Sequence, residues 1–179
     1  FATNDASIQR DWESALKGAA SNTDMSLRKE ATRLSAVGNA AAAAPELAKI
    51  LQTGSIPEKQ AALAALATIP GTVADEIIYG QIRPWVEGQP TPAELQLDIL
   101  EASESRKDER ILQYLNTYQQ SLSKTNPLAP YLTALKGGSV EAGRKVFIER
   151  TEAACVRCHR IAGQGGDVGP DLSGIGSKY

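Results

Sequence analysis

Apolar residues recur in this chain with a period slightly longer than 30 residues, and this repeat is the feature that most constrains its fold. Leu34, Leu66 and Leu100 are separated by 32 and 34 positions, and Val37 and Ile69 lie three positions after the first two. Each repeat spans two predicted helices, and such a period is typical of an α-solenoid. An irregular helical bundle is the alternative, because three matching pairs of apolar helices arise easily.

Residues 1–136 are predicted to form a series of short helices, since apolar residues recur at spacings of three and four. The predicted ranges are about 5–20, from Asp24 or Ser26 to Gly38, 45–54, 57–69, 73–86, 91–100 and 107–122. Pro45 and Pro57 are expected at first helical positions, and Pro84 is expected to interrupt or end its helix. Thr91 and Glu94 have the spacing of a capping box.

The composition favours helices over strands. Hydrophobic residues make up 42% of the chain but aromatic residues only 5%, and the apolar residues are mainly Ala and Leu. These two residues lead the helix propensity scale, whereas β-branched and aromatic residues favour strands. We therefore expect an all-α fold rather than a β-sandwich or barrel.

The charge balance gives no sign of a nucleic-acid partner. Nineteen basic and 21 acidic residues give a formal net charge of −2, and no basic cluster of the kind that binds nucleic acid is present. No apolar run reaches the length of about 18 residues that a transmembrane helix needs. The chain begins at Phe1 without an initiator methionine or a secretory signal pattern, so we expect a mature or excised part of a longer protein.

Gly137 and Gly138 mark the predicted domain boundary, with helical repeats in 1–136 and a second domain in 137–179. An amphipathic helix is predicted from Ser139 to Arg150. The segment that follows is rich in glycine and poor in apolar residues, so it is not expected to form a packed core unless another group fills it.

Both cysteines and the only histidine lie in one short stretch, Cys155-Val156-Arg157-Cys158-His159. Cys-x-x-Cys-His is the attachment signature of c-type haem. The two thiols add across the two vinyl groups of the porphyrin, and the two-residue gap spans the distance between those groups. The next residue is then held close to the iron, so His159 is expected to be its proximal axial ligand and Cys155 and Cys158 to carry covalent haem c.

Three other interpretations of this stretch stay open. A structural zinc site needs four protein ligands, and the stretch offers only two cysteines and an adjacent histidine. A thioredoxin-like redox pair follows a strand in a βαβ unit, and no strand is predicted before Cys155. A disulfide, or two buried thiols beside an unrelated histidine, is the third.

The sequence on both sides of this motif resembles class-I cytochrome c. The resemblance rests on Gly143 and Phe147 before the motif and on Gly169-Pro170-Asp171-Leu172 after it. It implies that Gly143 and Phe147 pack against the last helix of such a domain. It also implies that the Pro170 carbonyl accepts a hydrogen bond from His159 Nδ1–H, which orients the ligand, and that Leu172 packs on the haem face.

The glycine-rich segment 163–176 is similar to the haem domain at the C-terminus of large exported dehydrogenase-like proteins of planctomycetes and verrucomicrobia. In those proteins a β-propeller, likened to quinone-dependent sugar dehydrogenases, precedes HEAT-like helices and the cytochrome. The resemblance implies HEAT-like repeats in 1–136, followed by the N-terminal part of a cytochrome c domain in 137–179. It also implies a periplasmic or otherwise exported protein, since this type of haem attachment takes place outside the cytoplasm.

The expected function is electron transfer by the haem iron, as the relay module of a larger exported dehydrogenase, with a dehydrogenase domain or a redox protein as partner. The fragment itself is not expected to be an enzyme, because no nucleophile with a base, no paired carboxylates and no phosphate loop are found. The alternative is a helical-repeat scaffold that docks partners or domains.

The distal haem ligand is not expected within the chain. In class-I cytochromes this ligand, usually a methionine, lies well downstream of the Gly-Pro-x-Leu segment. The only methionine, Met25, is expected to fill the core instead. The chain ends at Tyr179, twenty residues after His159, so the cytochrome domain is expected to be incomplete at its C-terminus.

Overall fold

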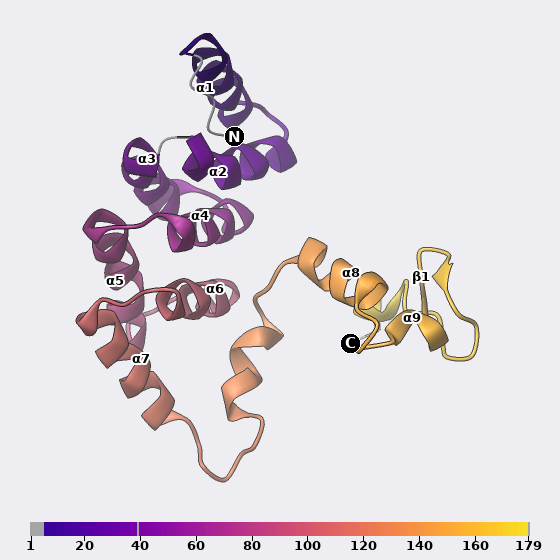
Figure 1. The fold of residues 1–179 in the computed structure, drawn as a ribbon. Coiled ribbons are helices and arrows are strands. Elements are labelled where there is room, and N and C mark those ends of the chain that lie inside the picture. The colour runs from indigo at the N-terminus through magenta and orange to yellow at the C-terminus, as the bar shows by residue number, and fades with distance from the viewer. Residues whose placement is uncertain (1–5, 39, 179) are drawn as a thin grey trace. The chain divides into compact units, whose positions relative to one another are not determined.

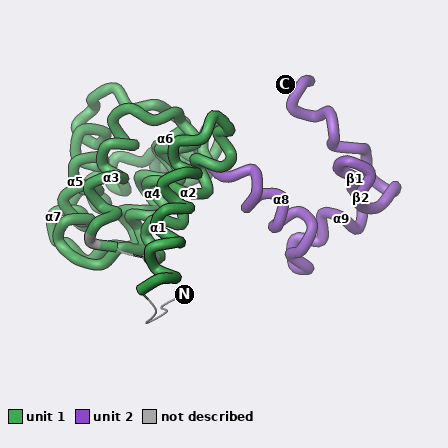
Figure 2. Tube along the Cα trace, turned by 90° about the horizontal axis from the view of Figure 1, so that it is seen from above, with its two compact units in different colours: residues 1–137 green, residues 138–179 purple. Residues whose placement is uncertain are grey.

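A computed structural model of the chain describes residues 6–38 and 40–178. The helix start expected at Asp5, and the chain ends Phe1 and Tyr179, lie outside the described residues. The chain forms two compact units, Phe1–Gly137 and Gly138–Tyr179 (Figure 2). Almost all regular structure in the described residues is helical, which confirms the all-α fold class. Within these residues no helix has the length and apolar character needed to cross a bilayer.

The first unit is a two-layered array of antiparallel helices (Figures 1 and 2). Its elements are α1 (Ala6–Ala20), α2 (Met25–Gly38), α3 (Ala40–Thr53), α4 (Ile56–Thr68), α5 (Thr72–Val86), α6 (Ala93–Glu104), α7 (Glu109–Ser121) and the 3₁₀ helix η1 (Ala129–Leu135). Helices α2, α4 and α6 pack side by side in one layer, and η1 packs against α6. Helices α3, α5 and α7 form the other layer, and α1 packs on α2.

The apolar core lies between these layers. Its fully buried large apolar side chains are Leu47, Leu63, Leu66, Ile78, Ile82, Ile99 and Ile111. The 32- and 34-residue spacing locates the correct helices but is wrong about individual positions. Leu34 and Leu100 are only half-buried, and Ile99 takes the innermost position in α6 because α6 presents Leu95, Ile99 and Ala102 to the core. Met25, expected in the core, is half-exposed at the start of α2.

Two prolines lie inside helices, contrary to the sequence-based expectation. Helix α3 begins at Ala40, so Pro45 is an internal residue rather than the first one. The alanines before Pro45 extend the helix backward because alanine has the highest helix propensity. Pro84 does not end α5, which continues to Val86. Because Pro84 lies in the last turn, the helix has little length left to disrupt beyond it.

The start of one helix, α6, also differs from expectation. The capping box predicted at Thr91 and Glu94 does not form, because the Thr91 hydroxyl donates instead to the Gln89 carbonyl, at 3.3 Å. A capping box is found at Ser55 and Glu58, where α4 begins. The Glu58 carboxylate accepts hydrogen bonds from the Ser55 backbone N–H, at 2.9 Å, and from the Ser55 hydroxyl.

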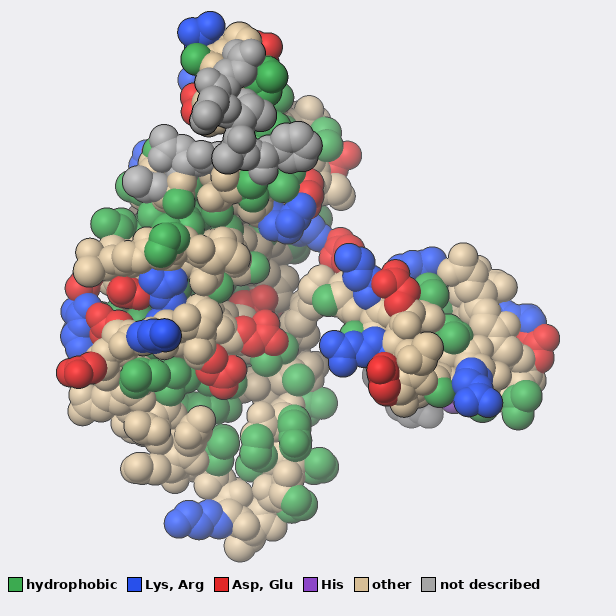
Figure 3. Space-filling view, viewed as in Figure 1, with side chains coloured by type: hydrophobic (Ala, Val, Ile, Leu, Met, Phe, Trp, Pro, Cys, Tyr) green, Lys and Arg blue, Asp and Glu red, His purple; other side chains and the backbone are tan. Residues whose placement is uncertain are grey.

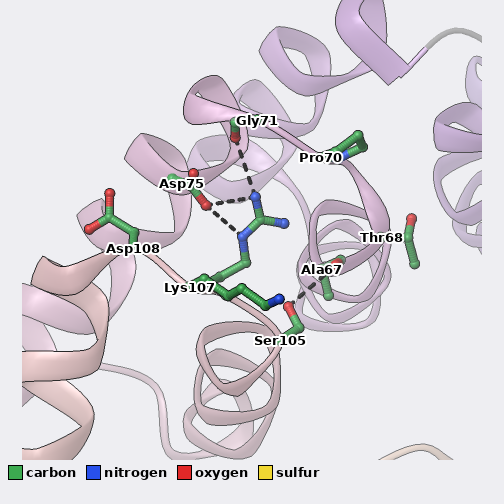
Figure 4. A pocket seen from close by; sticks show the side chains of 9 residues that line it. Ala67, Thr68, Pro70, Gly71, Asp75, Ser105, Lys107 and Asp108 are labelled. Atoms are coloured by element: carbon green, nitrogen blue, oxygen red, sulfur yellow. Dashed lines mark hydrogen bonds and ion pairs between the residues drawn. The ribbon is translucent and has the colours of Figure 1, made fainter.

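Arg106 connects two turns on the same edge of the array. Its Nε donates to Asp75 Oδ1 at 2.6 Å and its Nη2 to the Gly71 carbonyl at 3.3 Å (Figure 4). Its Nη1 donates to the Ile69 carbonyl at 2.7 Å. Arg106 is buried although it is charged, and burial of a charge is tolerated when partners of this kind surround it. The residue therefore fixes the α6–α7 turn against the α4–α5 turn.

The second unit is small and has little regular structure. It consists of α8 (Val140–Glu149), the one-turn helix α9 (Cys155–Cys158), a hairpin of β1 (Arg160–Ile161) and β2 (Gln164–Gly165), and the 3₁₀ helix η2 (Ile175–Ser177). Ser139 caps α8, since its hydroxyl oxygen accepts the Ala142 N–H at 3.2 Å. Among the described residues of this unit, 138–178, none is fully buried.

Replacement of Arg106 by alanine is expected to destabilise the first unit strongly. The Arg106→Ala change leaves the largely buried Asp75 carboxylate without its cation, which should lower the free energy of unfolding by about 3 kcal/mol. Urea unfolding followed by tryptophan fluorescence measures this change in the first unit, because Trp12 and Trp85 are the only tryptophans.

Arg33→Ala is the matched control for that experiment. Arg33 pairs with Glu30 one turn away, and both side chains are about half-exposed. Loss of such a surface pair should cost less than about 0.5 kcal/mol. Equal losses in the two variants would contradict the structural role given to Arg106.

Glu58 should make the stability of the first unit depend on pH in acid. Hydrogen bonds from Ser55 and from Arg28 lower the pKa of Glu58 from 4.5 to about 2. Because the folded-state pKa is the lower one, the carboxylate stabilises the fold fully above about pH 4.5, and this contribution is lost as the pH falls toward 2. Urea midpoints between pH 5 and 2.5 should fall less steeply for Glu58→Gln than for the wild type.

Glu46→Gln serves as the control for the pH experiment, because Glu46 is exposed and makes only a surface pair with Lys49. This variant should keep the wild-type slope. An identical slope in Glu58→Gln and in the wild type would show that Glu58 does not cause the acid sensitivity.

Candidate functional site

The one-turn helix α9 carries both cysteines. Ala154 enters it with a left-handed backbone, φ 51°, and the His159 N–H closes the turn on the Cys155 carbonyl at 2.9 Å. The three-residue separation places Cys155 and Cys158 on the same side of the turn. Both are free thiols in the structure, with Cys155 half-buried and Cys158 exposed.

The imidazole of His159 is held by a backbone carbonyl. Its Nδ1 lies 3.0 Å from the Pro170 oxygen. A carbonyl oxygen can only accept a hydrogen bond, so Nδ1 carries a proton, and in the neutral imidazole Nε2 then keeps its lone pair. This tautomer leaves Nε2 as the nitrogen that can bind a metal ion, and the carbonyl partner on the other nitrogen fixes the orientation of the ring.

Three glycines allow the segment 163–170 to pass directly against α9 and His159. A Cβ atom on Gly169 would lie 2.8 Å from both Nδ1 and Cε1 of His159. A Cβ atom on Gly165 would collide with the His159 carbonyl, and one on Gly166 would collide with the Arg157 carbonyl. Only residues without a side chain fit at these positions, so the glycines are part of the site.

The same segment is hydrogen bonded to the motif through its backbone. The Gly166 N–H donates to the Val156 carbonyl at 2.8 Å, and the Gly169 N–H donates to the Cys158 carbonyl at 2.6 Å. These carbonyls belong to a helix too short to satisfy them internally, so the loop supplies the missing donors.

Leu172 is positioned through its backbone, since its N–H donates to the Arg160 carbonyl at 2.8 Å. Its side chain is half-buried. Asp171 and Ser173 stabilise the turn around it, and hydrogen bonds from the hydroxyl and N–H of Ser173 lower the pKa of the exposed Asp171 carboxyl. Leu172 therefore lies on the segment that begins at Pro170 and returns past the motif.

Residues that the sequence analysis did not single out also hold the site together. Arg144 of α8 donates to the Gln164 side-chain oxygen at 2.8 Å, which connects α8 to the hairpin, and Arg160 forms an ion pair with Asp167. The sequence carries no specific signal for these side-chain pairs. The sequence analysis did not predict the close backbone approach of the glycine-rich segment, and its glycine content is the signal that could have indicated it.

The resemblance to class-I cytochrome c implies that two residues of α8, Gly143 and Phe147, pack against a last helix. Gly143 has no atom within 4 Å of the position that a Cβ would take, among the residues described. Phe147 is half-buried.

The residues present fit the chemistry of a haem. Two free thiols lie on one helical turn, the adjacent imidazole offers Nε2, and the unit exposes apolar side chains such as Val146 and Ile175. A haem face needs apolar cover of this kind. For the zinc interpretation, residues 6–38 and 40–178 hold no group of three or more His, Cys, Asp or Glu side chains that could bind a metal ion. For the thioredoxin interpretation, the element before α9 is a helix, and the hairpin follows the motif.

Comparison with known proteins agrees with this reading of the site. The family model for cytochrome c matches residues 140–179, a range that contains α8, the motif and the glycine-rich segment. No curated protein and no solved structure matches the chain. The family match supports a c-type cytochrome region at this end of the chain and, in general terms, electron transfer by haem.

The structure predicts that Gly169 controls the tautomer of His159. In Gly169→Ala the new methyl group would push the imidazole away from the Pro170 carbonyl, so the Nδ1–H form should lose its preference. Long-range ¹H–¹⁵N correlation spectra at alkaline pH, where the imidazole is neutral, distinguish the two tautomers of this single histidine.

Gly176→Ala is the control, because among the described residues no atom beyond its chain neighbours lies within 4 Å of the position of its added Cβ. This variant should keep the Nδ1–H tautomer. If Gly169→Ala also keeps it, the Pro170 carbonyl does not fix the ring.

Proposed function

We propose that residues 138–179 carry a haem c bound covalently through Cys155 and Cys158, with His159 as the proximal ligand of its iron, and that the protein transfers electrons through this group. The observation that carries the proposal is the His159–Pro170 contact of 3.0 Å beside two free thiols, of which Cys155 is half-buried and Cys158 exposed. This arrangement brings Nε2 of His159 and the sulfurs of Cys155 and Cys158 together at one turn of the chain. The family match over the same residues supports it.

When bound, the iron supplies reversible one-electron chemistry, and the protein supplies attachment and orientation. Each thiol gives one thioether bond, so Cys155 and Cys158 fix the group at two points. Pro170 fixes the plane and tautomer of the ligand, and Gly169 gives the ring the space that it needs. We propose that Leu172 contributes apolar cover on one face, which would influence the reduction potential by limiting access of water.

We further propose that this module belongs to an electron-relay system outside the cytoplasm. Covalent attachment at a Cys-x-x-Cys-His motif takes place in such compartments, so a periplasmic or otherwise exported protein is the consistent location. The donor would be a dehydrogenase, either as a separate redox partner or as another domain of a larger oxidoreductase. In this proposal the residues described here relay electrons and do not act on a substrate.

A scaffold function for the first unit is the second candidate. It is favoured by the two-layered array, in which α2, α4 and α6 form one layer and α3, α5 and α7 the other. HEAT-like repeats are built in this manner, and such arrays offer extended surfaces to partners. A scaffold should fold and bind its partner without haem, whereas electron transfer requires it.

The decisive experiment is to express the full chain in a host that attaches haem to such motifs and to record the alkaline pyridine haemochrome spectrum. A c-type band that survives acid–acetone extraction is expected from the wild type, together with reversible reduction by dithionite and reoxidation by ferricyanide. Cys155→Ala/Cys158→Ala should lose the extraction-resistant band completely, because no thioether can form.

Arg157→Ala is the matched control, since Arg157 lies between the cysteines but is exposed; it should keep the full band. Absence of covalent haem from the wild type in this host would overturn the electron-transfer proposal. Tryptophan fluorescence that is unchanged in the double-cysteine variant would then leave the scaffold function as the account of the first unit.

A further inference from the structure

Aromatic side chains are scarce in this chain, yet four of them gather where α5 packs against α7. The rings of Tyr79 and Tyr114 meet edge to face, with their centroids 5.8 Å apart. The rings of Trp85 and Tyr118 lie 4.9 Å apart between centroids. All four side chains are only half-buried, so packing against the apolar core uses only part of each ring.

The hydroxyl of Tyr114 has a carboxylate as its partner. It donates a hydrogen bond of 2.6 Å to Oε1 of Glu87, the residue that follows α5. Because only the protonated phenol can make this bond, the bond raises the pKa of Tyr114 to about 12. Within residues 6–38 and 40–178, Tyr114 is the only tyrosine whose hydroxyl donates to a carboxylate.

This hydrogen bond matters for the loss of an electron from the ring. A phenol that loses an electron becomes a very strong acid, so its oxidation is easiest where a base can take the proton at the same time. The Glu87 carboxylate lies within the distance over which a proton is transferred directly. Tyr114 is therefore equipped to lose an electron and a proton together.

The environment of Tyr79 has the opposite effect. The guanidinium carbon of Arg110 lies 4.8 Å from the centroid of the Tyr79 ring, and that of Arg83 lies 5.6 Å from it. The electron density of the ring face attracts these cations, and oxidation would remove that density. Of the two rings in contact, Tyr79 is thus the harder one to oxidise.

We propose that Tyr114 is a redox-active tyrosine that reduces strong one-electron oxidants, with Glu87 as its proton acceptor. The O–H bond of Tyr114 breaks, the electron passes to the oxidant, and the proton moves along the hydrogen bond to Oε1 of Glu87. The products are a neutral tyrosyl radical and a neutral carboxylic acid. The oxidants are of the class of radicals formed from peroxide. An electron from a small reductant such as ascorbate restores the phenol, and Glu87 returns the proton.

Small oxidants can reach this site from the solvent. Glu87 is exposed and Tyr114 is half-buried. Acidic and basic side chains are interspersed on the side of the array where α5 and α7 lie (Figure 3), so small oxidants of either charge can approach that face. Both residues belong to the first unit, so the site does not depend on haem.

Competition among the tyrosines of the full chain tests the proposal. Photochemically generated tris(bipyridine)ruthenium(III) serves as the one-electron oxidant, and a nitroso compound traps the tyrosyl radicals. Peptide mass spectrometry then gives the yield of adduct at each tyrosine. Accessibility alone would favour Tyr131, which is 68% exposed. We expect the highest yield at Tyr114 instead, and a lower yield at Tyr79 although its ring is adjacent.

Glu87→Gln identifies the proton acceptor. An amide keeps the shape of the side chain but is too weak a base to take the proton, so the yield at Tyr114 should fall to that at Tyr131 or below. Glu109→Gln makes the same change in charge at another exposed carboxylate and should keep the wild-type pattern. Tryptophan fluorescence verifies that both variants are folded. A highest yield at any other tyrosine, an unchanged yield at Tyr114 in Glu87→Gln, or an equal loss in Glu109→Gln would overturn the proposal.

Discussion

The close approach of a glycine backbone to α9 and His159 is the constraint on which the second unit depends. Without a buried residue among those described, this unit has no apolar core to define it. Its arrangement comes from backbone hydrogen bonds, such as that from Gly169 to the Cys158 carbonyl, and from the contact between Pro170 and His159. The site therefore relies on directional interactions, which orient a ligand well but stabilise a fold only modestly.

The first unit, in contrast, is held together mainly by burial of apolar side chains rather than by directional hydrogen bonds. Its interior is almost entirely leucine, isoleucine and alanine, and the layers are held together by non-directional burial of these side chains. The polar interactions that matter there lie at edges and helix starts, as with Arg106 at the turns and Glu58 at the start of α4. One chain thus combines a helical array that has a buried apolar core with a small unit whose backbone contacts are organised around Cys155, Cys158 and His159.

The sequence was sufficient for the fold class and for most helices, because apolar periodicity is a property of single elements. It was insufficient where two signals competed. The alanine run before Pro45 outweighed the preference of proline for a first helical position, and Thr91 bonded to Gln89 rather than to its helix. Ser55 and Glu58 had the same capping pattern and form the box. At the site, the sequence spacing indicated the motif residues, but the Arg144–Gln164 and Arg160–Asp167 pairs depend on how segments meet in space, which no local pattern encodes.

The position of Arg106 affects how the helices of the first unit unfold. In an ideal solenoid each repeat contacts its neighbours only through helix surfaces, and the ends can fray independently of the middle. Here one side chain is bonded to backbone carbonyls of the preceding turn, at Ile69 and Gly71. Opening of α6 and α7 therefore removes the Arg106 donor from the carbonyls of the α4–α5 turn at the same time. These four helices should behave as one cooperative block, with their amide protons exchanging in a single concerted event.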